Sequence, residues 1–401
     1  MSITNSDLQT RGDQVFIGTY VRYHAAMISG KGCILRDANG KEYLDFLSGI
    51  AVCSLGHCHP SVTEAICKQA ATLVHVSNLY YTQPQTDLAE MLIANSFADR
   101  VFMANSGAEA NEAAIKLARI ASEKGRHEII SLEGSFHGRT LATVAATGQP
   151  KFHQGFDPLP DGFLHVPFGD LAALADSITK RTCAIMCEPL QGEGGVRPLG
   201  NEYLHGIRSL CDKHGLLLIF DEVQTGMGRT GTLFAHEQYG ITPDIMTIAK
   251  ALGNGMPIGA MVTTDKLARA FVPGTHASTF GGNPVAAAAA VATLKVMLGD
   301  GFLAGVRERG EYLAGGLNSL VSRFPDLASG VRGLGLIRGL VLTEKGIKHG
   351  TEIVNAMFEK GFLINFAGNV VLRFVPPLIV STDQMDKLFE ALTVTLAEIG
   401  A

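Results

Sequence analysis

Short apolar segments alternate with helical segments between residues 85 and 298, and this alternation constrains the fold more than any other feature. Strands are predicted at 127–131, 183–188, 215–221, 245–249 and 259–263, and helices at 86–95, 107–123, 201–214 and 283–298. Strands that are separated by helices pair in parallel, with helices covering both faces of the sheet. The sequence therefore predicts an α/β domain around a mostly parallel central sheet.

The pattern changes on both sides of this region. Beyond residue 300 we expect a long helix at 302–323, strands at 332–342 and 363–374, and helices at 351–360 and 382–399, typical of a smaller α+β domain. Near the N-terminus, Asn39-Gly40 separates two strand-like segments and predicts a hairpin. We therefore predict an N-terminal arm and hairpin that join the small domain (1–52), a large domain (53–298) and a C-terminal small domain (299–401).

Composition bounds the classes of protein that fit this chain of 401 residues. Apolar residues make up 46% and charged residues 18%, which excludes intrinsic disorder. A net charge of −5 without charged blocks argues against a nucleic-acid-binding or membrane-surface protein. The first residues lack the basic start and apolar block of a signal peptide, so we expect a cytoplasmic protein.

The histidines and cysteines do not predict a metal site. His57 and His59 lie close together, but no carboxylate or third histidine stands at ligand spacing, so we interpret them as structural. Cys183 and Cys187 have no second pair to complete a zinc site. The seven cysteines are odd in number and the chain is long, which also argues against a disulfide framework.

Lys250 follows the apolar segment Ile245-Met-Thr-Ile-Ala249 and precedes a glycine-rich loop. Burial at the end of a strand disfavours the ammonium form and leaves an amine that can attack a carbonyl. Alternatively, the stem of the lysine packs on the core while its ammonium group reaches solvent. The segment alone favours this alternative, and the rest of the chain argues for the first.

Two loops can contribute to an anion or substrate site. Ser106, Gly107 and Ala108 begin a predicted helix, where free backbone N–H groups favour an anion, although the segment taken alone favours an ordinary serine cap. Phe136 and Arg139 follow a predicted strand at the edge of the sheet where ligands bind in such folds. The guanidinium suits a carboxylate; a core phenylalanine and a surface arginine are the alternatives.

Acidic residues stand directly after two buried strands. Glu188 and Glu193 lie on one glycine-rich turn, and Asp221 and Glu222 lie on another. A carboxylate at the end of an apolar strand needs a cation or a hydrogen-bond donor. A protonated pyridine nitrogen is such a donor, and an arginine of the chain is the alternative.

Together these residues match the requirements of pyridoxal phosphate. The cofactor needs an acid at its ring nitrogen (Asp221), a lysine at its aldehyde (Lys250), an anion cradle (Ser106 to Ala108) and an aromatic residue beside its ring (Phe136). Each match alone is weak, but the four together predict a pyridoxal-phosphate enzyme.

The sequence resembles the class III aminotransferases of fold type I along nearly its whole length. The resemblance is carried by Asn105-Ser-Gly-Ala-Glu-Ala-Asn-Glu112, Phe136-His-Gly-Arg139, the segment from Glu188 to Gly195, Asp221-Glu-Val-Gln-Thr-Gly-Met-Gly-Arg-Thr-Gly231 and Thr279-Phe-Gly-Gly-Asn-Pro284. It implies a fold type I pyridoxal-phosphate transferase with a large and a small domain.

The resemblance also implies the roles of the cofactor-binding residues. Lys250 would form a Schiff base with the cofactor and move the proton, and Asp221 would pair with the ring nitrogen. Val223 and Phe136 would cover the two ring faces, and Gln224 would reach the ring hydroxyl.

The phosphate is expected at Ser106, Gly107 and Ala108. Thr279 would reach the phosphate of the neighbouring subunit, so the resemblance implies a homodimer with shared active sites.

The substrate site is expected to alternate between two ligands. Arg139 would bind a carboxylate remote from the reacting amine, and Arg373 would bind the α-carboxylate of glutamate or 2-oxoglutarate. Glu193 would neutralise Arg373 while the amino donor is bound. Glu188 and Ser278 are also expected in the substrate site.

Within the family the chain is most similar to the acetylornithine branch. Ile50 replaces the tyrosine with which ornithine transaminases hold the free α-amino group, and Asn78 and Tyr80 are expected near the entrance. The resemblance implies transfer of the δ-amino group of N2-acetyl-L-ornithine to 2-oxoglutarate, with the reverse direction in arginine biosynthesis. Succinylornithine or succinyl-diaminopimelate, ornithine and 4-aminobutyrate transaminases are the alternatives, followed by an aminomutase or a relative that has lost catalysis.

Overall fold

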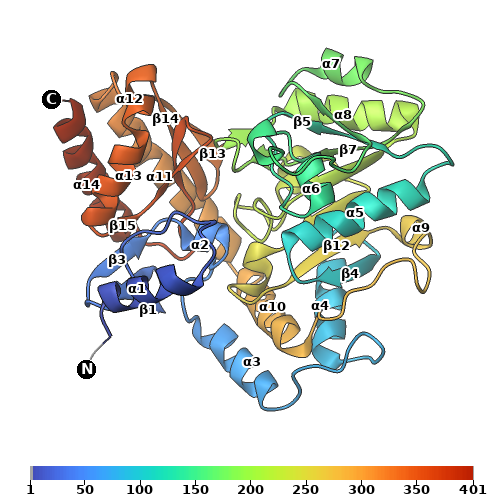
Figure 1. Cartoon of the computed structure of the whole chain (residues 1–401), viewed down its shortest axis with the longest axis horizontal. Coiled ribbons are helices and arrows are strands. Elements are labelled where there is room, and N and C mark those ends of the chain that lie inside the picture. The colour runs from blue at the N-terminus through green and yellow to red at the C-terminus, as the bar shows by residue number, and fades with distance from the viewer. Residues whose placement is uncertain (1–2, 401) are drawn as a thin grey trace.

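Seven strands form the central sheet of the computed structural model, which describes residues 3–400 (Figure 1). Their order across the sheet is β4-β12-β11-β10-β7-β5-β6. β12 runs antiparallel to both of its neighbours, and the other six strands are parallel to one another. The strands are β4 (Arg100–Ala104), β5 (Glu128–Leu132), β6 (Phe163–Val166), β7 (Thr182–Cys187), β10 (Leu217–Asp221), β11 (Ile245–Ile248) and β12 (Gly259–Thr263).

The five strands predicted in this region are confirmed, and two are added. β4 and β6 were not predicted. β6 forms one edge of the sheet and three of its four residues are only partly buried, so its apolar pattern is weak. β4 forms the other edge and begins at an exposed arginine.

Helices cover both faces of the sheet, as predicted. Ile219 of β10 packs on the side of α5 (Gly107–Ala121), and the next residue, Phe220, packs on the side of α8 (Asn201–His214). Successive strand residues point to opposite faces. This apolar strand therefore contributes side chains to the cores on both faces of the sheet. Two short helices, α6 (Leu141–Ala146) and α7 (Leu171–Asp176), complete the layers (Figure 1).

A second group of helices packs below the sheet. α10 (Pro284–Met297) contacts α3 (Pro60–Ala70) and α4 (Gln83–Ala94), and its start is capped by the side chain of Asn283. Shorter elements here and around the sheet are η1 (Pro150–Phe152), β8 (Leu190–Gln191), β9 (Arg197–Pro198), η2 (Ala235–Tyr239), η3 (Lys250–Gly253) and α9 (Asp265–Ala268).

The C-terminal part contains a four-stranded antiparallel sheet, β13-β14-β17-β16. The predicted strand 332–342 is wrong in form: β13 (Ala328–Leu334) and β14 (Ile337–Leu342) are a hairpin that reverses at Gly335, where φ is +50°. The predicted strand 363–374 is likewise three strands: β15 (Phe362–Leu363), β16 (Asn365–Ala367) and β17 (Val371–Phe374). A glycine turn inside an apolar segment leaves the apolar pattern unbroken, so the pattern does not show where one strand ends and the next begins.

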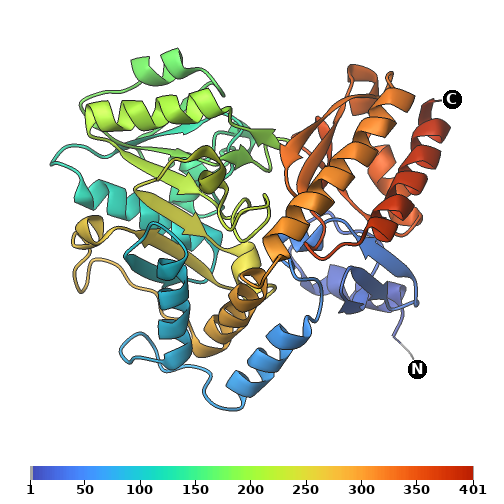
Figure 2. The same cartoon turned by 180° about the vertical axis from the view of Figure 1, so that it is seen from behind.

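Helices pack on one side of this sheet. They are α11 (Phe302–Arg323), α12 (Glu344–Lys348), α13 (Gly350–Glu359) and α14 (Thr382–Gly400). Figure 2 shows α11 lying alongside α14, and the two helices are in contact. The predicted helices of this region are therefore confirmed within a few residues.

The N-terminal strands belong to a third sheet, which includes a C-terminal strand. β1 (Met27–Lys31), β2 (Ile34–Asp37) and β3 (Glu42–Asp45) are antiparallel, and β2 and β3 form the predicted hairpin. β3 also pairs in parallel with β15. This pairing supports our proposal that the N-terminal hairpin is part of the small domain; Met1, Ser2 and Ala401 lie outside the described residues.

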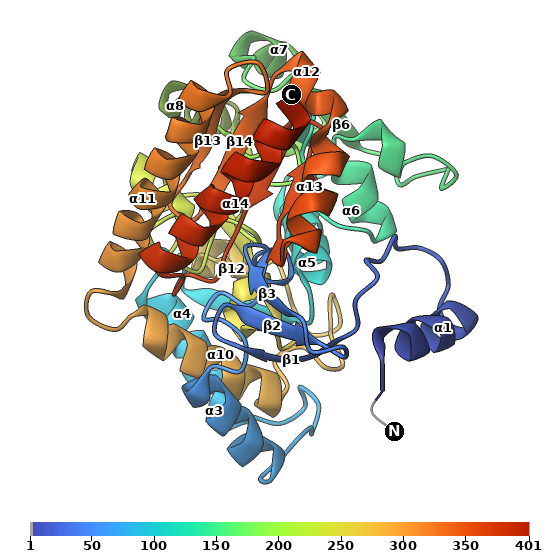
Figure 3. The ribbon, with the colours of Figure 1, turned by 90° about the vertical axis from the view of Figure 1, so that its left-hand side faces the viewer.

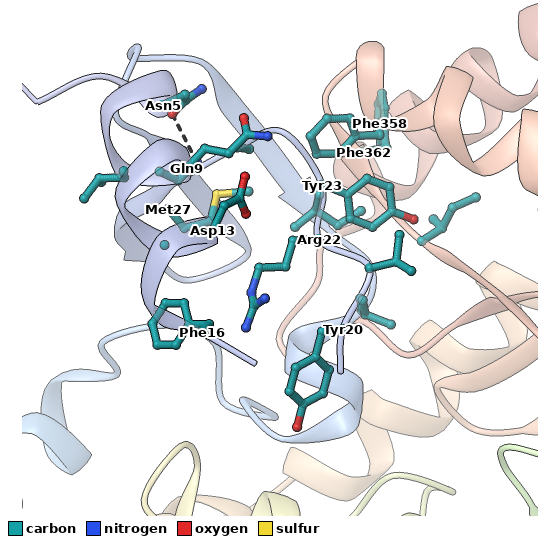
Figure 4. Close-up of a pocket in the computed structure, with 18 residues that line it drawn as sticks. Asn5, Gln9, Asp13, Phe16, Tyr20, Arg22, Tyr23, Met27, Phe358 and Phe362 are labelled. Carbon is teal, nitrogen blue, oxygen red and sulfur yellow. Dashed lines mark hydrogen bonds between the residues drawn. The ribbon is translucent and has the colours of Figure 1, made fainter. Parts of the chain in front are cut away.

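The first helix, α1 (Asn5–Val15), has no buried residue, and its first residue, Asn5, is hydrogen-bonded to Asp37 at the end of β2 (Figure 3). A cavity of about 460 Å³ separates it from the small domain (Figure 4). Tyr23 closes one side by stacking on Phe358 at 4.7 Å between ring centroids, and Arg22 lies 5.0 Å from the ring centroid of Phe16. The arm is therefore attached at two places, through the hydrogen bonds of Asn5 at the start of the helix and through Tyr23 in the segment that follows it.

Within residues 3–400, no single helix is long and apolar enough to cross a membrane. α10 and α11 reach that length and apolar content only as a pair, and they are bent by 74° at their junction. Both helices contribute buried side chains to the protein core.

Candidate active site

The strand ends bring most of the predicted site residues to one edge of the central sheet. β4, β5, β7, β10 and β11 all end at this edge, because they are parallel. The residues after them surround a cavity of about 380 Å³. Its lining comprises Val52, Asn105, Ser106, Gly107, Ala108, Asn111, Phe136, His137, Gly138, Arg139, Glu188, Asp221, Val223, Gln224, Ala249, Lys250, Gly255, Met256, Pro257 and Ile258.

Lys250 stands two residues beyond β11 and begins the short helix η3. Its φ of +44° lies in the left-handed region, which is uncommon for a residue with a side chain and is often found at functional sites. Burial lowers the pKa of its ammonium group, and Arg373 lowers it further, whereas Glu193 and Asp221 oppose the shift. The lysine is therefore biased towards the neutral, nucleophilic amine.

Asp221 is held in one orientation by three hydrogen bonds. Its Oδ2 accepts from Nδ1 of His137 and from Nδ2 of Asn111, both at 2.8 Å, and its Oδ1 accepts from the N–H of Val223 at 3.0 Å. The residue is only 3% exposed. Among the described residues no arginine or lysine pairs with it, so the alternative of a structural arginine pair is wrong for Asp221.

The start of α5 is both a capped helix and an open anion site. The Ser106 side chain accepts from the N–H of Glu109 at 3.1 Å, and the Glu109 carboxylate accepts from the N–H of Asn105 at 2.5 Å. The cap leaves the N–H groups of Gly107 and Ala108 without an intrahelical partner. These groups line the cavity, so the serine cap and an anion site are compatible.

Gly107 is required by the close approach of Val223. A Cβ added at Gly107 would lie 2.7 Å from Cγ1 of Val223. We predict that Gly107→Ala displaces Val223 or the helix start and lowers cofactor affinity by about tenfold, because overpacking of this kind costs about 1–3 kcal/mol. Equilibrium dialysis against pyridoxal phosphate measures the change.

Gly315→Ala is the matched control, because it is also in a helix and no atom lies within 4 Å of its added Cβ. An unchanged dissociation constant in Gly107→Ala would contradict the steric argument.

Phe136 and Arg139 lie at the outer wall of the cavity. The rings of Phe136 and Phe152 meet edge to face at 5.7 Å between centroids. Cζ of Arg139 lies 3.9 Å from the centroid of Phe152 and 5.5 Å from that of Phe136. Arg139 is exposed, so its guanidinium is positioned by the aromatic rings and remains open to an anion.

Glu188 is a buried carboxyl group at the wall of the cavity. Its two oxygens accept from the N–H groups of Phe136 at 2.9 Å and Gly192 at 3.2 Å. Burial raises the pKa of Glu188, and the Asp221 carboxylate adds to this, whereas His137 and the two N–H groups oppose it. Near neutral pH the side chain can therefore hold or release a proton.

Arg373 and Glu193 form a contact between the two halves of the molecule. Arg373 is fully buried on β17, and its Nη1 lies 2.5 Å from Oε1 of Glu193. Gln224 joins the pair, accepting from Arg373 at 3.1 Å and donating to Glu193 at 3.3 Å, and Asn365 accepts from Nε of Arg373 at 3.0 Å. Burial raises the pKa of Glu193, but Arg373 outweighs this and lowers it.

Five residues that the sequence singled out are not part of the cavity lining: Glu193, Glu222, Ser278, Thr279 and Arg373. Thr279 is exposed and is not part of its lining, and its predicted contact with a neighbouring subunit stays a prediction. Ser278 contacts the site indirectly, because its Oγ accepts from Nδ2 of Asn105 at 3.2 Å. Glu222 points inward and accepts from the N–H groups of Ala235 at 2.6 Å and His236 at 2.9 Å.

The sequence interpretation missed His137 and Asn111, which hold Asp221. Both lie in segments that carry the family resemblance, Asn111 in 105–112 and His137 in 136–139. Asn111 is four residues after Gly107 and three before Ala114, so it lies on the apolar face of a helix. A polar residue on that face was the signal that could have identified it.

The cavity residues fit pyridoxal phosphate by their own chemistry. Asp221 is buried, is bound by no lysine or arginine among residues 3–400, and has accepting capacity for a ring N–H. Gly107 and Ala108 offer N–H groups for a phosphate, and Lys250 offers an amine with a lowered pKa.

Comparison with known proteins gives full-length matches. The family model "Aminotransferase class-III" matches residues 19–396. An acetylornithine aminotransferase from Caldanaerobacter subterraneus subsp. tengcongensis is 51% identical over 385 residues, which cover 95% of this chain and 97% of that protein. One from Methanocaldococcus jannaschii is 51% identical over 387 residues, which cover 95% of each chain.

Solved structures of aminotransferases are also similar to this chain. An ornithine aminotransferase from Toxoplasma gondii has a TM-score of 0.94 and 30% identity, and the match covers 99% of this chain and 96% of that one. An N-acetylornithine aminotransferase from Stenotrophomonas maltophilia has a TM-score of 0.83 and 37% identity, with 97% and 98% coverage. The chain therefore belongs to the class-III aminotransferases: it is a pyridoxal-phosphate enzyme of fold type I that transfers amino groups between small molecules.

Proposed function

We propose that this enzyme transfers the δ-amino group of N2-acetyl-L-ornithine to 2-oxoglutarate, giving N-acetyl-L-glutamate 5-semialdehyde and L-glutamate. The observation that carries this proposal is the match to relatives named acetylornithine aminotransferase at about half identity over nearly the full length. The reverse direction serves arginine biosynthesis. A cytoplasmic location is part of the same proposal.

The geometry near the cavity entrance supports an acylated donor. Ile50 is 42% exposed and stands two residues before Val52, which lines the cavity. It belongs to the turn α2 (Ser48–Ala51), in which all four residues have positive φ. An apolar side chain there offers no hydrogen bond to a free α-amino group, whereas an acylated α-nitrogen carries no charge that needs one.

The bound cofactor supplies an electron sink beside the carbon that carries the amino group. Lys250 is placed to take the proton from that carbon and to return it, because its lowered pKa favours the unprotonated amine. The Asp221 carboxylate would keep the ring nitrogen protonated, and Phe136 and Val223 would cover the ring. Gln224 is proposed to bind the ring hydroxyl.

The Glu193–Arg373 pair supports the use of two different substrates at one site. With the pair closed, Arg373 is neutralised and tolerates the uncharged chain of the amino donor. When 2-oxoglutarate arrives, its carboxylate takes the place of Glu193 on the guanidinium. Glu193 is 29% exposed, so it can leave the pair towards solvent. Arg139 is proposed to bind the carboxylate remote from the reacting carbon, which is the single carboxylate of the amino donor and the γ-carboxylate of 2-oxoglutarate.

We predict that Arg373→Ala raises KM for 2-oxoglutarate by about 10- to 100-fold, because a hydrogen bond to a charged group contributes about 1.5–3 kcal/mol. The rate with the acyl donor should fall much less, since the donor does not use the guanidinium. Stopped-flow measurement of each half-reaction separates the two effects. Equal damage to both half-reactions would contradict the alternation between Glu193 and the substrate.

We also propose a homodimer in which Thr279 of one subunit reaches the phosphate of the other. Apolar side chains are exposed around the loop that precedes α4, namely Leu73, Val74, Leu79, Tyr80 and Tyr81. A large exposed apolar surface is typical of an interface. Loss of cofactor affinity in Thr279→Ala, with the dimer intact in ultracentrifugation, is the expected result.

The donor is tested by mixing the yellow enzyme with N-acetylornithine, N-succinylornithine, ornithine and 4-aminobutyrate separately. Fast bleaching by the acetyl compound alone supports the proposal, and equal bleaching by both acyl compounds indicates a broad acylornithine transaminase. If ornithine or 4-aminobutyrate reacts fastest, the proposed donor is wrong.

A further inference from the structure

Asn111 occupies a position in the structure that no proposed role yet explains. It is 1% exposed, lies one turn into α5 and contacts three different elements. Its Nδ2 donates to Oδ2 of Asp221 at 2.8 Å and to the backbone oxygen of His137 at 2.7 Å. Its Oδ1 accepts from Oγ1 of Thr247 at 2.7 Å. Both N–H donors of the side-chain amide are therefore committed, and its oxygen accepts from Thr247.

These contacts connect the three elements on which the cofactor site depends. α5 begins at Gly107, one turn before Asn111, and so carries the anion cradle. β10 ends at Asp221. β11 carries Thr247, which lies opposite Asp221 in the sheet and three residues before Lys250. The side chain of Asn111, on the helix that carries the anion cradle, therefore contacts both the strand that ends at Asp221 and the strand that precedes Lys250.

The hydrogen bonds of Asp221 also determine which oxygen remains available. A carboxylate has about four lone-pair sites, two on each oxygen. Within residues 3–400, Oδ2 already accepts from His137 and Asn111, while Oδ1 accepts only from the N–H of Val223. The one remaining site is on Oδ1. A further donor that enters the cavity must use this oxygen.

We propose that Asn111 is a positioning residue, which saturates Oδ2 of Asp221 and thereby presents Oδ1 to the ring nitrogen of the cofactor. This inference rests on the proposed use of Asp221 by the cofactor. Thr247 acts through Asn111: its hydroxyl fixes the amide so that the N–H side, and not the carbonyl side, faces the carboxylate. The carbonyl oxygen of His137 favours the same orientation, because it accepts from Nδ2.

Asn111→Asp tests the role with almost no change in shape. It keeps an oxygen for the Thr247 hydroxyl, removes the N–H donor and sets a second carboxyl group against Oδ2. We expect kcat to fall about 100-fold, as for a misplacement of catalytic groups by about 1 Å. KM for both substrates should change less than twofold, because the substrate residues Arg139 and Arg373 are untouched.

The second readout is the visible absorbance of bound pyridoxal phosphate as a function of pH. The ionisable groups that face Asp221 are His137, Glu188, Lys250 and Cys187. In Asn111→Asp the added carboxyl group competes for one proton with Asp221, so we expect a new titration of the absorbance between about pH 6 and 9. An aspartate at a position that does not contact Asp221 would not introduce one.

Thr247→Val and Thr247→Ser complete the series. The valine removes the hydroxyl at constant shape and should reproduce part of the loss in kcat; the serine keeps the hydroxyl and should lose less. Thr293→Val is the matched control, because Thr293 is also fully buried and its hydroxyl bonds to the oxygen of Ala289, away from the cavity.

The proposal is overturned if Asn111→Asp has the wild-type kcat and absorbance profile. It is also overturned if Thr293→Val lowers kcat as much as Thr247→Val, since the losses would then reflect stability alone. Failure of the proposed function is distinguishable. If the wild-type enzyme bleaches with none of the four donors, the pH titration of the bound cofactor still tests Asn111.

Discussion

Lys250→Ala is expected to reduce turnover by about 10⁴-fold, while the protein remains folded. The substitution removes both the nucleophile that holds the cofactor and the amine that moves the proton, and general acid–base catalysis alone contributes about 10²–10⁴-fold. Lys250 is also in a left-handed conformation, which an alanine tolerates no better and no worse. Steady-state rates with the best of the four donors measure the loss.

The variant is compared with Lys116→Ala, in which a lysine outside the cavity is removed from the same domain. Near-ultraviolet circular dichroism and thermal unfolding should be close to wild type for both variants. Residual transamination above about one hundredth of the wild-type rate in Lys250→Ala would be incompatible with the assigned role.

Asp221→Asn is expected to give the second largest loss, about 10³-fold in kcat. The carboxylate charge that keeps a ring nitrogen protonated is removed, and with it the ability of the cofactor to accept electrons. The amide would also set its NH₂ group against the donors of His137 and Asn111 or, if its oxygen keeps those contacts, against the N–H of Val223. We therefore expect weaker cofactor retention as well, measured by dialysis and by visible absorbance.

Asp212→Asn is the control, because that carboxylate is exposed on α8 and forms an ion pair with Arg208, away from the cavity. Exogenous cofactor at high concentration should restore occupancy of Asp221→Asn without restoring kcat. Full recovery of kcat under saturation would show that Asp221 contributes to binding alone.

The strand ends explain why much of the site could be predicted. Asp221 and Lys250 each follow an apolar segment, and a charged residue there needs a specific reason. Parallel pairing then brings such residues to one edge of the sheet without further information. The cavity lining agrees with the predicted residues from Ser106 to Ala108, and with Phe136 and Gln224.

Other parts of the fold and of the site depend on contacts between residues that are far apart in the sequence, and local sequence patterns do not reveal such contacts. Arg373 and Glu193 are 180 residues apart, and their pairing was expected only through the family resemblance. The reversal at Gly335 was missed because the flanking segments are both apolar. Asn111 was missed because its partners, Asp221 and Thr247, lie on two other elements.

The position of β4 at the edge of the central sheet has a consequence for folding during synthesis of the chain on the ribosome. Its only partner in the sheet is β12, which begins at Gly259, although β4 itself begins at Arg100. At about 5–20 residues per second on the ribosome, roughly 8 to 30 seconds separate the emergence of the two strands. During this interval the cradle at the end of β4 has no support from the sheet. The nascent chain therefore becomes competent for its cofactor only after both strands have left the exit tunnel.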